Sequence, residues 1–194
     1  MKRDYKSLAS EDLMLLVADG DQIAFSCLVN RHQDAVFRLI YRFFGREEEA
    51  NDLAQEVFVR IWRSSERYTP TSKFTTWLYT LTANICKSET QSLWRRNIRL
   101  IGSFWTLGDN DAPEIPANSP SPEDAALQTE QGRMVRAAIE SLPTNQRLAL
   151  VLRRYEELSY QEISVVIGCS VAAVEALLVR AKANLHKKLL PLEK

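Results

Sequence analysis

Residues 158–182 read LSYQEISVVIGCSVAAVEALLVRAK, a pattern typical of two short helices joined by a tight turn. Ser159 followed by Glu162 is a capping box, so a helix is expected to begin directly after Ser159. Gly168 suits the left-handed backbone of a three-residue turn, and Ser170 is a good cap for a second helix. Two helices in this arrangement form a helix-turn-helix, whose second helix lies in the DNA major groove. An αα-corner without a DNA role is the alternative.

The outer face of the second helix carries the side chains that would meet duplex DNA. Small residues at its start allow a close approach of the backbone, and its basic residues suit phosphates or base edges. For each charged residue, a solvated surface position is the alternative. The expected contacts are Ser170, Val171, Ala172, Ala173, Glu175, Ala176, Val179, Arg180 and Lys182. The stripe expected to face inward is Val171, Val174, Leu178, Ala181 and Leu185.

The composition is that of an ordinary globular protein. The 194 residues are 45% hydrophobic and 26% charged, which excludes a chain disordered throughout. No apolar run reaches the ~18 residues that cross a bilayer, and no secretory signal is expected at the N-terminus. Three widely spaced cysteines give neither a disulfide framework nor a metal pair and fit a reducing cytoplasm. We therefore expect a cytoplasmic protein.

Helical periodicity covers two blocks of the chain, and no strand is expected. The expected helices cover residues 10–19, 22–44, 47–64, 74–96, 124–141, 144–154, 160–167 and 171–189. Between the blocks, residues 108–124 hold four prolines and little apolar content. Such a segment continues no helix and buries no core.

These patterns predict an all-α fold with two small helical domains joined by a flexible acidic linker. We expect the domains over residues 1–96 and 126–194 and the linker over 97–125. Residues 97–126 carry 1 basic and 5 acidic groups, while the blocks on either side are mildly basic. Because the linker is long and rich in proline, it is expected not to fix the orientation of one domain against the other.

Four motifs, in this order and spacing, resemble the bacterial extracytoplasmic-function (ECF) sigma factors. They are DLAQEVFVRIW (52–62), FTTWLYTLTAN (74–84), LPTNQR (142–147) and LSYQEI (158–163). The resemblance covers about residues 22–96 and 125–189. It implies a sigma-2-like and a sigma-4-like domain in a factor that binds core RNA polymerase, directs it to specific promoters and initiates transcription. A stress or envelope-response regulon is the implied target.

In that family, the helix that matches residues 52–62 docks on a coiled coil of the largest polymerase subunit. The implied contacts are Asp52, Leu53, Gln55, Glu56, Phe58, Arg60 and Trp62. The residues themselves agree, because Asp52, Gln55 and Glu56 share one polar, acidic helix face that suits a basic partner. A solvated face is the alternative.

The resemblance also implies that the next loop and helix capture unpaired bases of the −10 element, while the helix-turn-helix reads the −35 element as duplex. The implied −10 contacts are Tyr68, Thr71, Ser72, Lys73, Trp77, Thr80, Asn84 and Lys87. Aromatic stacking and phosphate pairing are what single-strand capture requires. A core position is the alternative for Trp77.

The resemblance further implies an anti-sigma factor as a partner, one that can hold the protein at the inner membrane. An enzyme is not expected, because His32 and His186 are isolated and no glycine-rich phosphate loop is present. Both histidines are expected on helix surfaces, and no cofactor, metal or small-molecule substrate is expected. The alternatives are a dimeric helix-turn-helix regulator that acts without polymerase, and an interaction module with no DNA role.

Overall fold

The computed structural model describes residues 4–104 and 130–190, and over these residues the protein is all-α, as predicted. The first block contains α1 (Ser10–Ala18), α2 (Gln22–Phe44), α3 (Glu47–Ser64), the 3-10 turn η1 (Ser65–Arg67) and α4 (Phe74–Phe104). The second contains α6 (Glu130–Glu140), α7 (Thr144–Arg154), α8 (Tyr160–Ile167) and α9 (Val171–Leu189). None of these helices is by itself long and apolar enough to cross a membrane; α8 and α9 pass such a test only as a pair, which is bent by 95°.

The helix ends fall where the sequence predicts caps. The Asp21 carboxylate accepts two backbone N–H groups from the first turn of α2, at 2.9 and 3.0 Å. Gly45 ends the same helix in the left-handed conformation, with φ 76°. Ser159 and Glu162 form the complete capping box of α8, and Gly168 ends that helix at φ 79°. Local backbone chemistry thus sets the boundaries of α2 and α8.

One predicted boundary is wrong. Helix α4 begins at Phe74 as expected but continues to Phe104, so the first part of the predicted linker is helical. Residues 97–101 (NIRLI) contain no proline or glycine, and nothing in them stops a helix already under way. The proline-rich segment 108–124 lies outside the described residues. So do residues 124–129, at the expected start of the helix described as α6.

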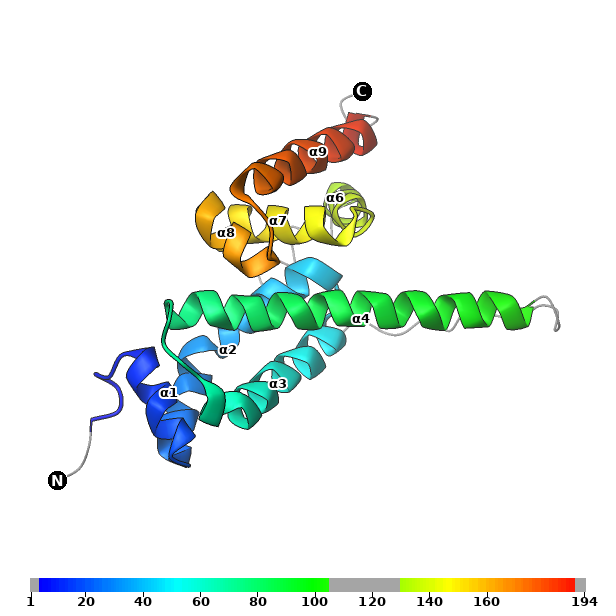
Figure 1. Ribbon diagram of the computed structural model, residues 1–194. Helices are drawn as coiled ribbons and strands as arrows, with labels where there is room; N and C mark the ends of the chain where they lie inside the picture. Colours follow the sequence, from blue (N-terminus) through cyan, green and yellow to red (C-terminus); the bar gives the residue numbers. More distant parts are fainter. Residues whose placement is uncertain (1–3, 105–129, 191–194) are drawn as a thin grey trace.

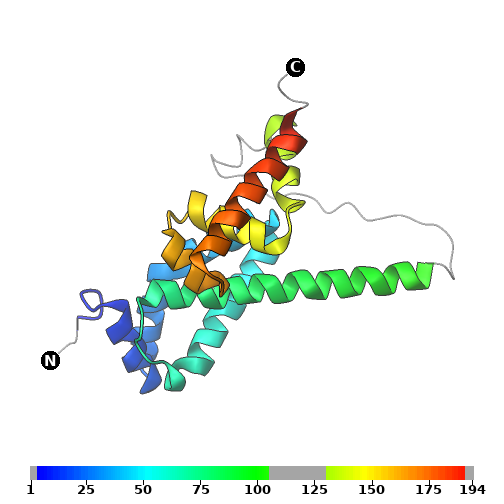
Figure 2. The ribbon, with the colours of Figure 1, turned by 45° about the horizontal axis from the view of Figure 1, so that its top comes forward.

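Helix α4 is the element of the first block that lies between the second block and helices α1 and α3. In Figure 1, α6–α9 lie on one side of it and α1 and α3 on the other, and the turned view of Figure 2 keeps this arrangement. Helix α2 packs on α1 and α3, and it also contacts α6 and α7. Helix α8 lies against α4. The far end of α4 extends beyond the other helices in both views.

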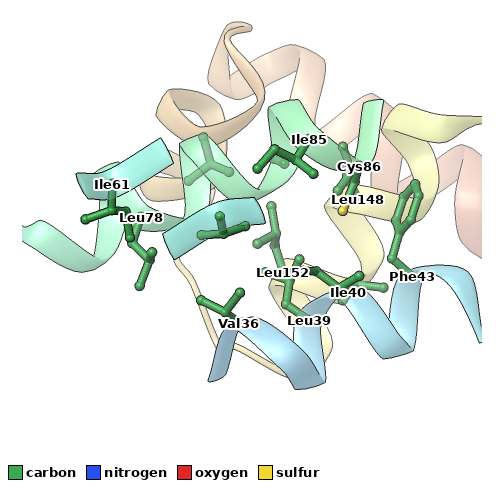
Figure 3. Close-up of a cluster of buried hydrophobic side chains, with 14 of the residues drawn as sticks. Val36, Leu39, Ile40, Phe43, Ile61, Leu78, Ile85, Cys86, Leu148 and Leu152 are labelled. Carbon is green, nitrogen blue, oxygen red and sulfur yellow. The ribbon is translucent and has the colours of Figure 1, made fainter. Parts of the chain in front are cut away.

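Side chains from both blocks form one apolar core (Figure 3). Leu148 and Leu152 of α7 lie among Ile40 and Phe43 of α2, and Cys86 of α4 lies beside Leu148. All five side chains are buried. The two blocks therefore have a defined orientation in this structure. From the sequence, we expected that the linker would not fix this orientation. The apolar positions of α7 were readable as core positions, but not as core shared with α2 and α4.

Two arginines of the second block bind the C-terminal end of α2, where backbone carbonyls lack partners within the helix. Arg147 donates to the Phe43 carbonyl at 3.1 Å, and its guanidinium lies 4.8 Å from the Phe43 ring centre. Arg136 donates to the Gly45 carbonyl and to the Tyr41 hydroxyl, both at 2.9 Å. Positive charge at a helix C-terminus is also favoured by the helix dipole.

A buried polar pair completes the contact. The Tyr79 hydroxyl of α4 donates to the Glu156 carboxylate of the α7–α8 turn at 2.7 Å. Burial, followed by this hydrogen bond, raises the pKa of Tyr79 far above its usual range, so the hydroxyl stays protonated and continues to donate. Arg42 of α2 lies 3.8 Å from the same carboxylate. The pairing satisfies groups that would be costly to bury alone.

Removal of Arg147 should loosen the contact between the blocks and expose Cys86. Burial raises the pKa of the Cys86 thiol to about 12, so the thiol should react slowly while the blocks are together. A hydrogen bond from a charged group is worth about 1.5–3 kcal/mol. In a Cys27→Ser/Cys169→Ser background, Arg147→Ala should therefore speed labelling of Cys86 by a thiol reagent by about ten-fold or more.

Arg153→Ala is the matched control, because Arg153 lies on the same helix and donates to Leu158 within its own block at 2.9 Å. Its labelling rate should stay close to that of the parent. Equal acceleration in both variants, or none in Arg147→Ala, would show that the Arg147 contact does not hold the blocks together.

Candidate functional site

An apolar groove of about 940 Å³ lies between α2 and α3. Its aromatic wall includes Phe25 and Trp62, whose ring centres are 5.0 Å apart in an edge-on arrangement. Val59 and Trp62 keep 40% and 37% of their surface exposed, which is unusual for large apolar side chains placed side by side. Polar residues that line the groove are Gln33, Asp34, Asn51, Gln55 and Arg63. An apolar floor with a polar rim is the anatomy of a docking surface.

The predicted polymerase contacts fall into three environments. Asp52, Gln55, Arg60 and Trp62 are exposed; Leu53 and Glu56 are partly buried; and Phe58 is 8% exposed. Three of them, Gln55, Phe58 and Trp62, line the groove. The Glu56 carboxylate accepts from the Arg60 guanidinium at 2.7 Å, so these two charges are paired on the surface of α3. Leu53 packs against the core and contributes less to the surface than its neighbours.

Sequence reasoning missed the half of the groove that α2 supplies. Phe25, Val29 and Phe37 line it, although the periodicity of α2 suggested only that its apolar residues face the core. With Gln33, these residues step by four along the helix and form a stripe separate from the buried positions Leu28, Val36, Leu39, Ile40 and Phe43. The sequence shows this second apolar stripe, but nothing in it distinguishes an open groove wall from a second buried face.

The loop predicted to reach the −10 element is exposed between two fixed ends. Thr71, Ser72 and Lys73 are exposed. At one end, the Tyr68 ring lies edge-on to Trp77, with centres 5.1 Å apart. The Tyr68 hydroxyl is buried without a hydrogen-bond partner among the described residues, and burial raises its pKa. Trp77 is partly buried, between the core position and the exposed position that the sequence left open.

The predicted −10 residues on α4 are not equally accessible. Asn84 is exposed, whereas Thr80 is partly buried and donates to the Thr76 carbonyl at 2.8 Å. Lys87 donates to the Ile167 carbonyl at the end of α8, at 2.9 Å, and burial lowers the pKa of this lysine.

Helix α8 contacts the predicted −10 surface at both of its ends. At its start, the Lys73 ammonium lies 3.7 Å from the carboxylate of the capping residue Glu162. The hydrogen bonds from Ser159 keep the pKa of Glu162 below its usual value, so the carboxylate is ionised at neutral pH. At its end, α8 holds Lys87. The first helix of the helix-turn-helix therefore covers part of the surface predicted for single-stranded DNA.

The outer face of α9 is open in this arrangement. The Ser170 hydroxyl accepts from the Ala173 N–H at 3.2 Å and begins the helix. The exposed residues are Val171, Ala172, Glu175, Val179, Arg180 and Lys182, and the partly buried ones are Ala173 and Ala176. Val171, also expected on the inward stripe, is 39% exposed, whereas Val174, Leu178 and Ala181 are buried. Val171 is the first residue of α9, so the predicted inward stripe is buried only from Val174 onward.

One histidine prediction is wrong. His32 is buried against Phe74, with ring centres 5.0 Å apart, and its Nε2 is hydrogen-bonded to the Ser10 hydroxyl at 2.9 Å. Burial lowers its pKa, so the ring is neutral at pH 7. His186 is exposed, as expected. Across residues 4–104 and 130–190, no three His, Cys, Asp or Glu side chains gather closely enough to hold a metal ion.

Comparison with known proteins gives this arrangement a family. The model of Sigma-70 region 2 matches residues 28–96, and the model of Sigma-70, region 4, matches residues 132–185. The RNA polymerase sigma-H factor of Pseudomonas aeruginosa is 34% identical over 94% of both chains. The ECF RNA polymerase sigma-E factor of Escherichia coli K12 is 31% identical over 96% of this chain and 97% of its own length.

Solved structures agree with these relatives. CnrH, solved in complex with the cytosolic domain of CnrY, is 28% identical and aligns with a TM-score of 0.66 over 96% of this chain and 100% of its own. The sigma factor RpoE of Bartonella quintana, solved with the anti-sigma factor NepR, shares the fold at a TM-score of 0.59 and 21% identity, over 85% and 96% of the two chains. Both family models match in order, and relatives above 30% identity span nearly the whole length. The chain belongs to the ECF family of RNA polymerase sigma factors.

Proposed function

We propose that different surfaces of this sigma factor bind core polymerase, the −10 element and the −35 element. As a member of its family it is an initiation factor, not an enzyme, and it directs core RNA polymerase to promoters. We assign polymerase binding and −10 capture to a domain over 1–96, −35 reading to a domain over 126–194, and the connection to 97–125, whose first residues form the end of α4. The observation that carries the assignment is the open apolar groove beside the acidic face of α3. A dimeric regulator that acts without polymerase is set aside by the family assignment.

The groove and the α3 face suit a helical, basic partner. A helix that lays apolar side chains into a groove is a common mode of recognition, and Phe25 and Trp62 offer aromatic anchors of the kind found at binding hot spots. Asp52 is exposed on α3 next in sequence to Asn51, which lines the groove, and Glu56 lies one turn further along. We infer that the coiled coil of the largest polymerase subunit occupies this groove and meets these carboxylates.

Charge reversal at Asp52 and Glu56 should weaken binding to core polymerase. In the double variant Asp52→Lys/Glu56→Lys, the acidic face of α3 becomes basic and repels a basic partner. Affinity for core polymerase should therefore fall by about ten-fold or more. Glu48→Lys is the control, because Glu48 is an exposed carboxylate on the same helix and lies before the matched stretch 52–62. Binding is measured by titration of labelled sigma factor with core, and helical content by circular dichroism. Unchanged affinity in the double variant would overturn this assignment.

The exposed loop 69–73 and the face of α4 near Asn84 suit unpaired DNA. An amide can read a Watson–Crick edge, and the partly exposed Trp77 offers a ring for stacking. Asn84 is exposed on α4 one turn before Lys87, which supplies positive charge once it is released from α8. We propose that this surface captures the melted −10 strand.

Asn84→Ala should slow promoter opening and leave duplex binding intact. Loss of one base-reading amide should cost about 1–3 kcal/mol in strand capture. The measurement compares open-complex formation, followed by permanganate reactivity of unpaired thymines, with binding of a duplex that carries the −35 element only. Ser88→Ala, at an exposed position one turn further along α4, is the control. Equal losses in both assays, or none, would contradict the assignment.

Helix α9 suits the major groove. Small residues lie at its exposed start, and Arg180 and Lys182 are exposed further along. Arginine binds guanine bidentately, whereas lysine pairs with phosphate as a point charge. We therefore assign base reading to Arg180 and phosphate contact to Lys182.

The two substitutions should differ in kind. Arg180→Ala should cost about 1–3 kcal/mol and relax preference at one −35 position. Lys182→Ala should weaken all sequences alike and reduce the salt dependence of binding by about one ion. Holoenzyme affinities over a set of −35 variants at several salt concentrations separate the two effects. A uniform loss from Arg180→Ala would reduce it to a positioning contact.

Promoter binding requires the two blocks to part. The −10 and −35 elements lie about 25 base pairs apart, which is about 85 Å along B-form DNA. In the present arrangement α8, which belongs to the −35 reader, lies on the −10 surface of α4 and holds Lys87. We propose that this arrangement is the form without promoter, and that polymerase separates the blocks.

We further propose control by an anti-sigma factor. CnrH was solved with CnrY bound and RpoE with an anti-sigma factor, and a helical segment in the α2–α3 groove would exclude polymerase by competition. A sigma factor acts on polymerase in the cytoplasm, and such a partner anchored in the inner membrane would retain it there until released. The resemblance extends this proposal to a stress or envelope-response regulon.

Competition between the anti-sigma partner and core polymerase tests the occlusion. The partner is taken as the product of a neighbouring gene that binds this chain, and it is titrated against a preformed complex of sigma factor and core. It should displace core and inhibit transcription in proportion. Partner and core bound together on one sigma factor, with transcription undiminished, would refute occlusion.

A further inference from the structure

Helix α1 supplies the cap for the helix that carries the proposed −10 surface. The Glu11 carboxylate accepts the backbone N–H of Phe74, the first residue of α4, at 2.6 Å. N–H groups in a first helical turn have no partner within the helix, and a negative charge there is favoured by the helix dipole. This hydrogen bond is the main cause of the lowered pKa of Glu11, so the carboxylate is ionised at neutral pH.

Glu11 is held where it can do this. Next to it in α1, the Ser10 hydroxyl is hydrogen-bonded to His32 of α2, at 2.9 Å, and accepts from Arg31 at 3.1 Å. Arg31 also donates to the Leu8 carbonyl at 2.9 Å. These hydrogen bonds hold the residues just before Glu11 against α2. The backbone of Glu11 is therefore fixed in place, and its carboxylate extends from there to α4.

The other end of the exposed loop 69–73, at Tyr68, is fixed by aromatic packing. Tyr68, which precedes the loop, packs edge-on against Phe74 and Trp77, with ring centres 6.3 and 5.1 Å away. The His32 ring of α2 also packs against the Phe74 ring. Residues 69–73 thus span two anchored points, and Glu11 holds the anchor on the α4 side.

We propose that Glu11 is a positioning residue for capture of the −10 strand: by accepting the Phe74 N–H, it fixes the first turn of α4 and the 69–73 loop in the shape that receives unpaired DNA. The proposal rests on the function proposed above for that loop and for Asn84. It places a functional residue in α1, before the region 28–96 that the family model matches. The carboxylate touches no DNA and acts through the backbone of α4.

Three variants separate this role from a general effect on folding. Glu11→Ala removes the acceptor, and Glu11→Gln keeps an oxygen at the same place without the charge. Asp12→Ala removes an exposed carboxylate from the same turn of α1 and serves as the matched control. A charged acceptor for one backbone N–H is worth about a ten-fold or larger effect. Glu11→Ala should slow open-complex formation by about that factor, Glu11→Gln should recover most of the rate, and Asp12→Ala should match the parent.

The assay uses holoenzyme and a promoter selected by the parent holoenzyme from a randomised duplex library. Permanganate reactivity follows opening, and affinities for core polymerase and for −35 duplex are measured on the same preparations. Both affinities should be unchanged in Glu11→Ala, whereas a merely unfolded variant would lose them. Equal opening by Glu11→Ala and Asp12→Ala, or a Glu11→Gln variant as slow as Glu11→Ala, would overturn the proposal.

The Asn84→Ala holoenzyme distinguishes the two possible failures. If Asn84→Ala opens promoter slowly while Glu11→Ala does not, the −10 surface stands and the role of Glu11 falls. If neither variant slows opening, the proposed −10 surface itself is wrong, and the role of Glu11 falls with it.

Discussion

The shared apolar core between α7, α2 and α4 is the constraint on which the rest of the structure depends. Leu148 and Leu152 are buried on side chains of the other block, and burial of such a residue is worth about 1.5–3 kcal/mol. Because the apolar contact is non-directional, it brings the blocks together without setting their angle. The angle comes from the polar contacts around it, where Arg147 and Arg136 meet the end of α2.

When the blocks part, water takes the place of these polar contacts. Arg147 and Lys87 bind backbone carbonyls at helix ends, and such carbonyls and cations are well hydrated once exposed. Separation of the blocks therefore costs the apolar contact together with the net contribution of these charged hydrogen bonds, about 1.5–3 kcal/mol for each. Polymerase and promoter shift the equilibrium only by as much as they bind the separated form more tightly than the closed one.

Local signals in the sequence predicted most of the fold, because helix ends depend on hydrogen bonds and backbone conformations within a few residues. Asp21 and Ser159 begin helices, and Gly45 and Gly168 end them, through contacts within a few residues. Long-range contacts left no such trace. The hydrogen bond from Phe74 to Glu11 joins residues 63 positions apart, and His32 is buried by a partner on another helix. The extension of α4 to Phe104 was not predicted, although residues 97–101 contain no proline or glycine that would end the helix.

The candidate surfaces show the same division. Exposed positions on α3 and α9 followed from helical periodicity, and the sigma-factor resemblance gave those positions a partner. The α2 wall of the groove did not follow, since a stripe such as Phe25, Val29 and Phe37 has the period of a core face whether or not another helix covers it. Periodicity indicates which residues lie together, but only the packed structure shows which stripe stays uncovered.

Gly45 joins a local rule to this long-range arrangement. Its left-handed backbone ends α2, and a Cβ atom at this position would collide with the Glu140 carboxylate and crowd Arg136, both on α6. A methyl group there strains the left-handed turn and makes the Glu140 and Arg136 side chains shift away from the end of α2. The left-handed end of α2 and the close approach of α6 therefore both depend on the lack of a side chain at one residue.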